Sequence, residues 1–181
     1  SIEDSVHRVF AGSVRDRLQL DDWQVQESRV ISPYGNVTKY RGMARNVDSV
    51  QSAQSYKYSW YEEAHKASKN SIDKLLPTIL RNPGAECWFS ANPQSRADPF
   101  SQRFITPYLH ELTKNGYYED DMHIIVVVNW RDNPWFNDVL MKEKERSYKL
   151  DVKRGKPKYN WIWEGQCLPA VEGAIFAEEI A

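Results

Sequence analysis

Three short apolar runs that alternate with helical patterns constrain the fold of this chain more than any other feature. Residues 56–61, 85–89 and 123–128 each have the length of a buried strand, and the last run is continuous and rich in β-branched side chains. Strands that alternate with helices are typical of an α/β fold. We therefore expect the three runs to form one parallel core sheet, flanked by helices in three layers. The helical stripe between the first two runs consists of Ile72, Leu75, Leu76 and Ile79.

The remaining segments predict further helices and an antiparallel hairpin. Apolar residues between positions 2 and 18 recur at helical spacing, and helical residues are expected again near 104–112. Turn residues within segment 23–41 separate two alternating stretches, which predicts an antiparallel hairpin at an edge of the fold. Pro77 is expected to kink or end its helix, and Pro134 to begin another one. The expected apolar face of that last helix is Phe136, Val139 and Leu140.

The composition is that of an ordinary globular protein, with 41% hydrophobic and 27% charged residues. No apolar run approaches the roughly 20 residues needed to span a bilayer. Cys87 and Cys167 are far apart and form no Cys-x-x-Cys pair, which argues against a Cys-based zinc site and a disulfide framework and favours a reducing cytoplasm. The formal net charge of −1 lacks the signature of a nucleic-acid binder, so a DNA-handling role would need a local basic patch.

Two adjacent carboxylates, Glu62 and Glu63, follow the first apolar run. The carboxyl end of a strand is where α/β sheets bind their ligands. In an ATPase, one such carboxylate holds magnesium and the other accepts a proton from the attacking water. Taken alone, the pair is more often the solvated start of a helix, where the helix dipole favours acidic side chains.

A small polar group, Ser90 to Pro93, follows the second run. In many ATPases a polar side chain at this place contacts the γ-phosphate or the attacking water. Taken alone, the group is an ordinary Asn-Pro turn.

A basic segment lies between residues 153 and 158. Lys153, Arg154, Lys156 and Lys158 are the best local candidates for contacts with a phosphate backbone. An ordinary solvated loop is the alternative, and the near-zero net charge favours it.

Six motifs occur in a fixed order along the chain: Trp60-Tyr61-Glu62-Glu63-Ala64; Leu75-Leu76-Pro77-Thr78-Ile79; Trp88 to Pro93; Asp98, Phe100 and Arg103-Phe104; Asn129 to Phe136; and Tyr159, Ile162, Trp163 and Gly165. In this order they resemble the ATPase domain of the tailed-phage terminase large subunit, in its P22-like and defective-prophage branch. The opening residues 1–6 are similar to the family's helix after its second strand. The resemblance thus spans nearly the whole chain and is weakest between residues 20 and 55.

The resemblance implies a P-loop NTPase-like fold of the ASCE type, with residues 1–152 as a partial ATPase domain and 153–181 as a hinge toward a nuclease domain. It assigns Glu62 to magnesium, Glu63 to the catalytic base, and Asn92 with Ser90 to coupling. It implies ATP and Mg²⁺ as ligands of the complete protein. The implied partners are double-stranded DNA, the portal protein and the small terminase subunit, with a possible oligomer on the portal, in the cytoplasm of the bacterial host and without a membrane role.

The sequence departs from the family pattern in one respect that matters for activity. The 181 residues contain no Gly-x-x-x-x-Gly-Lys-Ser/Thr loop, so we expect an N-terminally truncated ATPase domain that binds nucleotide poorly and hydrolyses it negligibly. The nuclease domain is likewise expected to lie beyond this chain. The alternatives are a catalytically inactive prophage remnant or interaction module that keeps the fold, and an unrelated α/β nucleic-acid-binding protein, against which the net charge argues.

Overall fold

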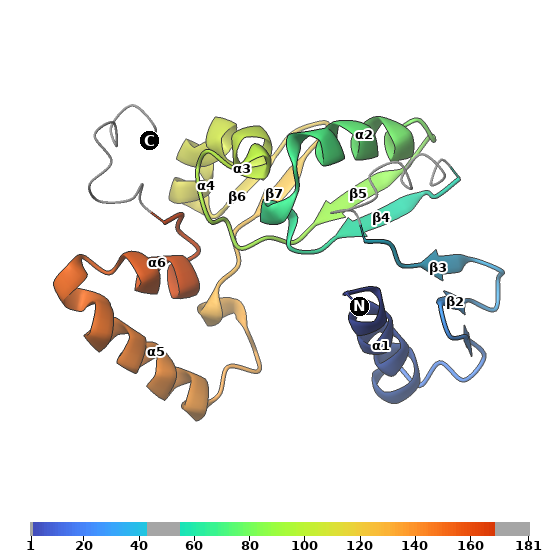
Figure 1. The fold of residues 1–181 in the computed structure, drawn as a ribbon, viewed down its shortest axis with the longest axis horizontal. Coiled ribbons are helices and arrows are strands. Elements are labelled where there is room, and N and C mark those ends of the chain that lie inside the picture. The colour runs from blue at the N-terminus through green and yellow to red at the C-terminus, as the bar shows by residue number, and fades with distance from the viewer. Residues whose placement is uncertain (1, 43–54, 169–181) are drawn as a thin grey trace. The chain divides into compact units, whose positions relative to one another are not determined.

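The computed structural model describes residues 2–42 and 55–168 (Figure 1). Contacts divide the chain into two compact units, Ser1–Gln54 and Ser55–Ala181, which are described separately. No helix in the described ranges is both long and apolar enough to cross a membrane.

The first unit combines a helix with a small antiparallel sheet. The α-helix ends at Gly12 and continues as one π-helical turn. Val14 in this turn and Val30 in the sheet are both buried. The expected antiparallel hairpin is confirmed, and a further short strand joins it in the order β1-β2-β3. The elements are α1 (Ile2–Gly12), η1 (Ser13–Arg17), β1 (Gln24–Val25), β2 (Arg29–Ile31) and β3 (Val37–Lys39).

The second unit is built on a parallel strand pair joined by a helical crossover. Strands β4 (Tyr58–Tyr61) and β5 (Glu86–Phe89) pair in parallel, which confirms two of the three predicted core strands. The crossover consists of η3 (Ala64–Lys66) and α2 (Lys69–Leu80). The stripe Ile72, Leu75, Leu76 and Ile79 is buried as predicted, with at most 7% of each residue exposed.

Helix α2 begins at a side-chain cap and continues through a proline. The Ser68 hydroxyl accepts a hydrogen bond from the Ser71 backbone N–H at 3.1 Å, which satisfies one of the free donors of the first turn. Pro77 lies inside the helix rather than at its end. Pro77 lies on the exposed side of the helix, whereas its neighbours Leu76 and Ile79 are buried. The free energy gained by burying these two side chains outweighs the loss of the backbone hydrogen bond that proline cannot make.

The third predicted core strand does not join the parallel pair. β7 (Ile124–Val126) pairs with β6 (Tyr117–Glu119) in an antiparallel sheet of its own, so the expectation of one parallel sheet for all three runs is wrong for the described residues. The reason is local. Asp120 accepts backbone hydrogen bonds from Met122 and His123 at 2.8 and 2.6 Å, which closes a tight hairpin between adjacent segments.

Helices cover the same side of both sheets. They are α3 (Pro99–Phe104), η4 (Thr106–Tyr108) and α4 (Leu109–Asn115), in the region where helical residues were expected. The Phe104 ring lies 5.2 Å from that of Phe89 on β5 and 6.2 Å from that of His123 at the start of β7. The Tyr108 ring stacks on Tyr118 of β6 at 4.0 Å.

The opposite side of both sheets carries exposed apolar side chains, which we call the open sheet face. Parallel strands are usually covered on both sides, so this exposure is unusual. The helices identified in residues 55–168 therefore account for a layer on one side, and the three-layer arrangement stays a prediction. The open sheet face consists of Tyr58 (60% exposed), Trp60 (75%), Trp88 (62%), Ile124 (69%) and Val126 (56%).

The C-terminal part of the unit is a helical hairpin (Figure 1). Its long helix begins at Asp138 and not at Pro134, because the Asn137 side chain caps it by accepting from the Leu140 N–H at 3.0 Å. The predicted apolar face is only partly covered, since Val139 is 74% exposed. The elements are η5 (Trp130–Asp132), α5 (Asp138–Asp151), η6 (Val152–Arg154) and α6 (Pro157–Glu164).

Candidate functional site

The candidate site lies where β4 and β5 end side by side (Figure 1). The Ser90 N–H donates to the Tyr61 carbonyl at 3.1 Å, and the Ala64 N–H donates to the Ser90 carbonyl at 3.0 Å. These two hydrogen bonds continue the pairing past the ends of both strands. The acidic segment at Glu62 and Glu63 is therefore held against the polar segment that begins at Ser90, as expected for the carboxyl ends of neighbouring parallel strands.

Glu63 adopts a left-handed backbone conformation, with φ 56° and ψ 40°. For a side chain other than glycine this conformation costs roughly 1–2 kcal/mol, and such strained residues cluster at functional sites. The strain arises where the chain leaves β4 and turns at once into η3, whose Lys66 N–H donates to the Glu63 carbonyl at 2.9 Å.

The Glu63 carboxylate has a cationic partner. Its Oε2 atom lies 2.7 Å from Lys66 Nζ and 3.8 Å from His65 Nε2. The hydrogen bond from Lys66 holds the pKa of Glu63 below its ordinary value, so the group is ionised at neutral pH. Glu62, by contrast, is exposed and forms no ion pair with another described residue. No cluster of three or more His, Cys, Asp or Glu suited to a metal occurs in the described ranges.

On the β5 side, the Ser90 hydroxyl is held by an indole. Trp60 Nε1 donates to Ser90 Oγ at 3.0 Å, across the two strands. The sequence assigned no role to Trp60 by itself, although its place at the head of the Trp-x-Glu-Glu-Ala motif was a signal. Asn92 is half-buried, two residues further along the loop. That loop is tied to the C-terminal segment, because the Leu168 N–H donates to the Gln94 carbonyl at 2.9 Å.

The site stands on the main hydrophobic core of the unit. Ala64 and Ala67, which flank the turn after Glu63, are 0% and 3% exposed. The Phe89 ring at the end of β5 packs 5.9 Å from Phe100. The backbone beneath the acidic and polar segments is therefore fixed by packing, which favours a defined arrangement of their side chains.

The predicted basic segment is a tight helical turn rather than a loop. Lys153 and Arg154 lie in η6, and Lys156 precedes α6 with a left-handed backbone. Gly155, with φ 76°, allows the turn between the two. Lys158 lies in the first turn of α6. The four candidate cations therefore sit at the tip of the hairpin formed by α5 and α6.

The aromatic residues of α6 pack against α5 and the segment before it. The Tyr159 ring meets that of Tyr148 on α5 at 5.2 Å, and Trp163 meets Phe136 at 6.0 Å. Trp161 is half-buried.

A short ion pair fastens the end of α6. Arg131 Nη1 lies 2.6 Å from the Glu164 carboxylate. Burial alone would raise the pKa of Glu164, but hydrogen bonds from Arg131, Trp130 and Tyr159 outweigh it and lower that pKa. The ionised form of Glu164 is thus the one that the hairpin stabilises.

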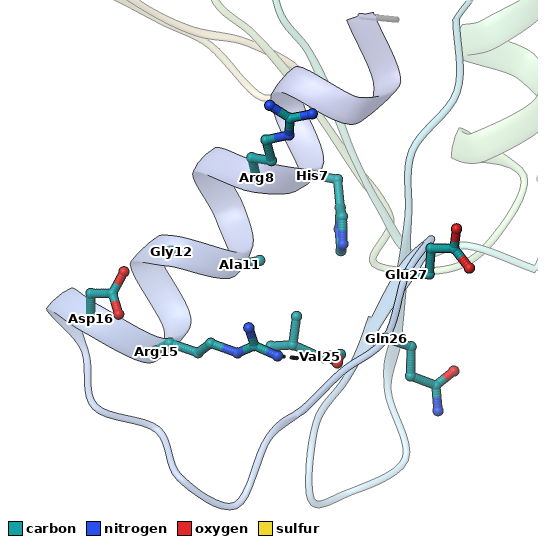
Figure 2. A pocket seen from close by; sticks show the side chains of 9 residues that line it. All are labelled: His7, Arg8, Ala11, Gly12, Arg15, Asp16, Val25, Gln26 and Glu27. Atoms are coloured by element: carbon teal, nitrogen blue, oxygen red, sulfur yellow. Dashed lines mark hydrogen bonds between the residues drawn. The ribbon is translucent and has the colours of Figure 1, made fainter.

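The first unit contains a shallow hollow of about 490 Å³ between α1 and the sheet. Figure 2 shows Arg15 reaching from the helical segment toward the backbone carbonyl of Val25, at 3.4 Å. His7 and Arg8 line the hollow together with the acidic residues Asp16 and Glu27. It includes none of the residues assigned to the candidate site, and its mixed charges select no ligand class.

Comparison with known proteins places the chain in a family. A family model described as phage terminase large subunit matches residues 1–166. The chain therefore belongs to the phage terminase large subunit family, which implies a role in phage DNA packaging. A search of curated proteins finds no match.

Proposed function

We propose that the ends of β4 and β5 form the acidic and coupling half of the ATPase site of a DNA-packaging motor. The proposal includes the ASCE-type P-loop fold and the P22-like branch. Glu63 is the catalytic base, Glu62 the magnesium ligand, and Asn92, supported by Ser90, the coupling residue. The single observation that carries the proposal is the strained backbone of Glu63, which lies between two residues, Tyr61 and Ala64, that are hydrogen-bonded to Ser90.

The residues can perform these tasks in distinct ways. Glu62 is an exposed carboxylate, and Mg²⁺ in ATPases is bound through one or two carboxylates together with water and phosphate oxygens. Bound there, the ion would neutralise the charge that develops on the phosphates. Glu63 is ionised and can accept a proton once Lys66 moves aside. Trp60 fixes the Ser90 hydroxyl, which orients the start of the polar segment that contains Asn92.

The rest of the motor supplies what this half lacks. We propose ATP and Mg²⁺ as ligands of the complete protein, with the phosphate-binding loop contributed from outside these 181 residues. Double-stranded DNA, the portal protein and the small terminase subunit are the proposed partners, in the host cytoplasm. Residues 153–181 are the proposed hinge, with Lys153, Arg154, Lys156 and Lys158 as candidate DNA contacts.

A catalytically inactive interaction module is the second candidate. The observation that favours it is the 2.7 Å pair between Glu63 and Lys66, which occupies the proposed base. In an active motor this pair must open during the cycle, whereas in an inactive module it is a permanent stabilising contact.

The deciding experiment measures ATP turnover and binding in a protein in which a phosphate-binding loop precedes residue 1. Glu63→Gln should reduce turnover by about 10²–10⁴-fold, because a general base is lost, and should leave ATP binding intact. Glu86→Gln is the matched control, since Glu86 is an exposed carboxylate at the opposite end of the same strand pair. Turnover of the Glu63→Gln protein within a few-fold of the unsubstituted protein would reject the assigned role.

A further inference from the structure

Helix α5 carries a straight row of cations on its outer side. Lys142, Arg146, Lys149 and Lys153 follow one another at intervals of four, three and four residues. At 3.6 residues per turn, these intervals place α5's three cations on one face, and η6 continues the row to Lys153. The row extends over roughly 16 Å, with about 5 Å of rise between successive cations. We call it the basic ridge.

The hairpin packs through the other side of the same helix. Lys144 Nζ lies 4.3 Å from the centre of the Trp130 ring and 5.9 Å from that of Tyr159, and Tyr148 packs against Tyr159. Lys144 lies about half a turn around the helix from the ridge, and Tyr148 about a third of a turn. The ridge therefore faces away from α6, and all four of its residues are exposed.

The ridge cations are largely without acidic partners. Arg146 has one weak contact, 3.8 Å from Glu143, between two exposed side chains. Lys142, Lys149 and Lys153 form no ion pair with another residue in the described part of the chain. Residues 138–164 contain eight Lys and Arg against five Asp and Glu, a net charge of +3, although the whole chain has −1. Positive charge is thus concentrated on this hairpin.

The hairpin holds the ridge in a fixed position. The Asp151 carboxylate, which is buried, accepts from the Tyr159 N–H at 2.9 Å and so ties the end of α5 to the start of α6. The Arg131–Glu164 pair fastens the other end of α6. Because the helix backbone is already ordered, binding an anionic partner would cost only the ordering of the exposed side chains.

From the spacing, exposure and rigidity of these cations, we infer that the basic ridge of α5 binds the phosphate backbone of duplex DNA without reading its sequence. A row of exposed cations can neutralise several phosphates at once, and backbone contacts position a protein on DNA without sequence information. The inference rests on the proposed packaging function, which supplies DNA as the partner. It moves the main contact from the hairpin tip to the outer face of α5.

The test compares two variants of equal charge change in the 181-residue chain. The ridge variant is K142E/R146E/K149E, and the tip variant is R154E/K156E/K158E. Binding to labelled duplexes of two unrelated sequences is measured by fluorescence anisotropy between low and moderate salt. The slope of log K against log salt is negative for DNA binding. In the ridge variant it should become less negative by about 2.7, that is by about 0.9 for each lost contact. The tip variant should change that slope by less than about 1.

The outcomes separate the inference from the proposed function. If only the tip variant lost binding, the ridge would not be the DNA contact, and the contacts proposed at the hairpin tip would be supported. No salt-dependent DNA binding by the unsubstituted chain would overturn the ridge without touching the ATPase assignment, which depends on the Glu63→Gln measurement. If the chain bound polyglutamate as tightly as DNA, the partner of the ridge would be an acidic protein rather than DNA. The neutral variant K142Q/R146Q/K149Q, checked by circular dichroism, loses the same three contacts and should show a similar change in slope with a smaller loss of affinity; unchanged binding would contradict the inference.

Discussion

The left-handed backbone of Glu63 can be tested by comparing Glu63→Gly with Glu63→Ala. Both substitutions remove the carboxylate and its exposed ion pair with Lys66, so the difference between the variants isolates the backbone. Alanine keeps the Cβ atom, which costs roughly 1–2 kcal/mol in this conformation, whereas glycine adopts it freely. Glycine in turn loses about 0.4–1 kcal/mol through the greater freedom of the unfolded chain.

The Glu63→Gly protein should therefore be the more stable of the two, by about 0.5–1 kcal/mol in the free energy of unfolding. Urea unfolding followed by tryptophan fluorescence measures this difference, because six of the seven Trp residues lie in the unit Ser55–Ala181. The comparison requires equal m-values. For a chain of this size, a melting experiment should show a difference of about 1–4 °C.

A neighbouring position provides the control. Lys66 has an ordinary helical conformation in η3, so Lys66→Gly should be less stable than Lys66→Ala, the reverse of the order at Glu63. If Glu63→Ala proves as stable as Glu63→Gly, the backbone of Glu63 is not strained. The observation that carries the proposed function would then be lost.

Three further predictions concern the other features of the second unit. Lys66→Met should raise the pKa of Glu63 toward its ordinary value, since the lysine hydrogen bond lowers it; a ¹³C-carboxyl titration measures this, and an unchanged pKa would contradict the pair. Because the pKa of Glu164 is lowered in the folded chain, its stabilising effect is present above about pH 4.5 and is lost as pH falls through the folded pKa. Glu164→Gln should therefore flatten the decline of stability below that pH, a result that urea midpoints at several pH values would show or refute. Replacing Trp60 and Trp88 together by Ser should reduce concentration-dependent self-association in ultracentrifugation, because both indoles are more than 60% exposed on the open sheet face; an unchanged profile would mean that this face does not drive association.

The sequence pattern predicted the elements that depend on burial and missed those decided by local hydrogen bonds. The α2 stripe and the parallel pair followed from periodicity, since each buries apolar side chains against the other. The sheet partner of residues 123–128 could not be read in this way. A continuous apolar run does not identify its neighbour, and the turn at Asp120 favours the adjacent segment. The start of α5 was misplaced for a similar reason, because two Asn-based caps compete within residues 129–138 and the second one begins the helix.

For the candidate site, the sequence could indicate which residues meet but not how they are held. Placement of Glu62 and Glu63 after one strand and Ser90 after the next implied a common edge, and the parallel register brings these segments together. The left-handed Glu63, its Lys66 partner and the Trp60 hydrogen bond depend on side-chain geometry. Hydrophobic periodicity carries no information on such contacts.

The different spans of the two strand pairs set an order in which the second unit folds. In the β6–β7 hairpin, Glu119 pairs with Ile124, five residues away, whereas Tyr58 pairs with Glu86 across 28 residues. A hairpin closes within about 1–10 μs, while the parallel pair must wait until the crossover through α2 has brought its ends together. We therefore expect amide protection in a refolding pulse-labelling experiment to reach Tyr118 and Ile125 before it reaches Ser59 and Trp88. The acidic and polar segments beyond β4 and β5 would then meet only in the last steps of folding, and a nascent chain would acquire its hairpin well before its candidate site.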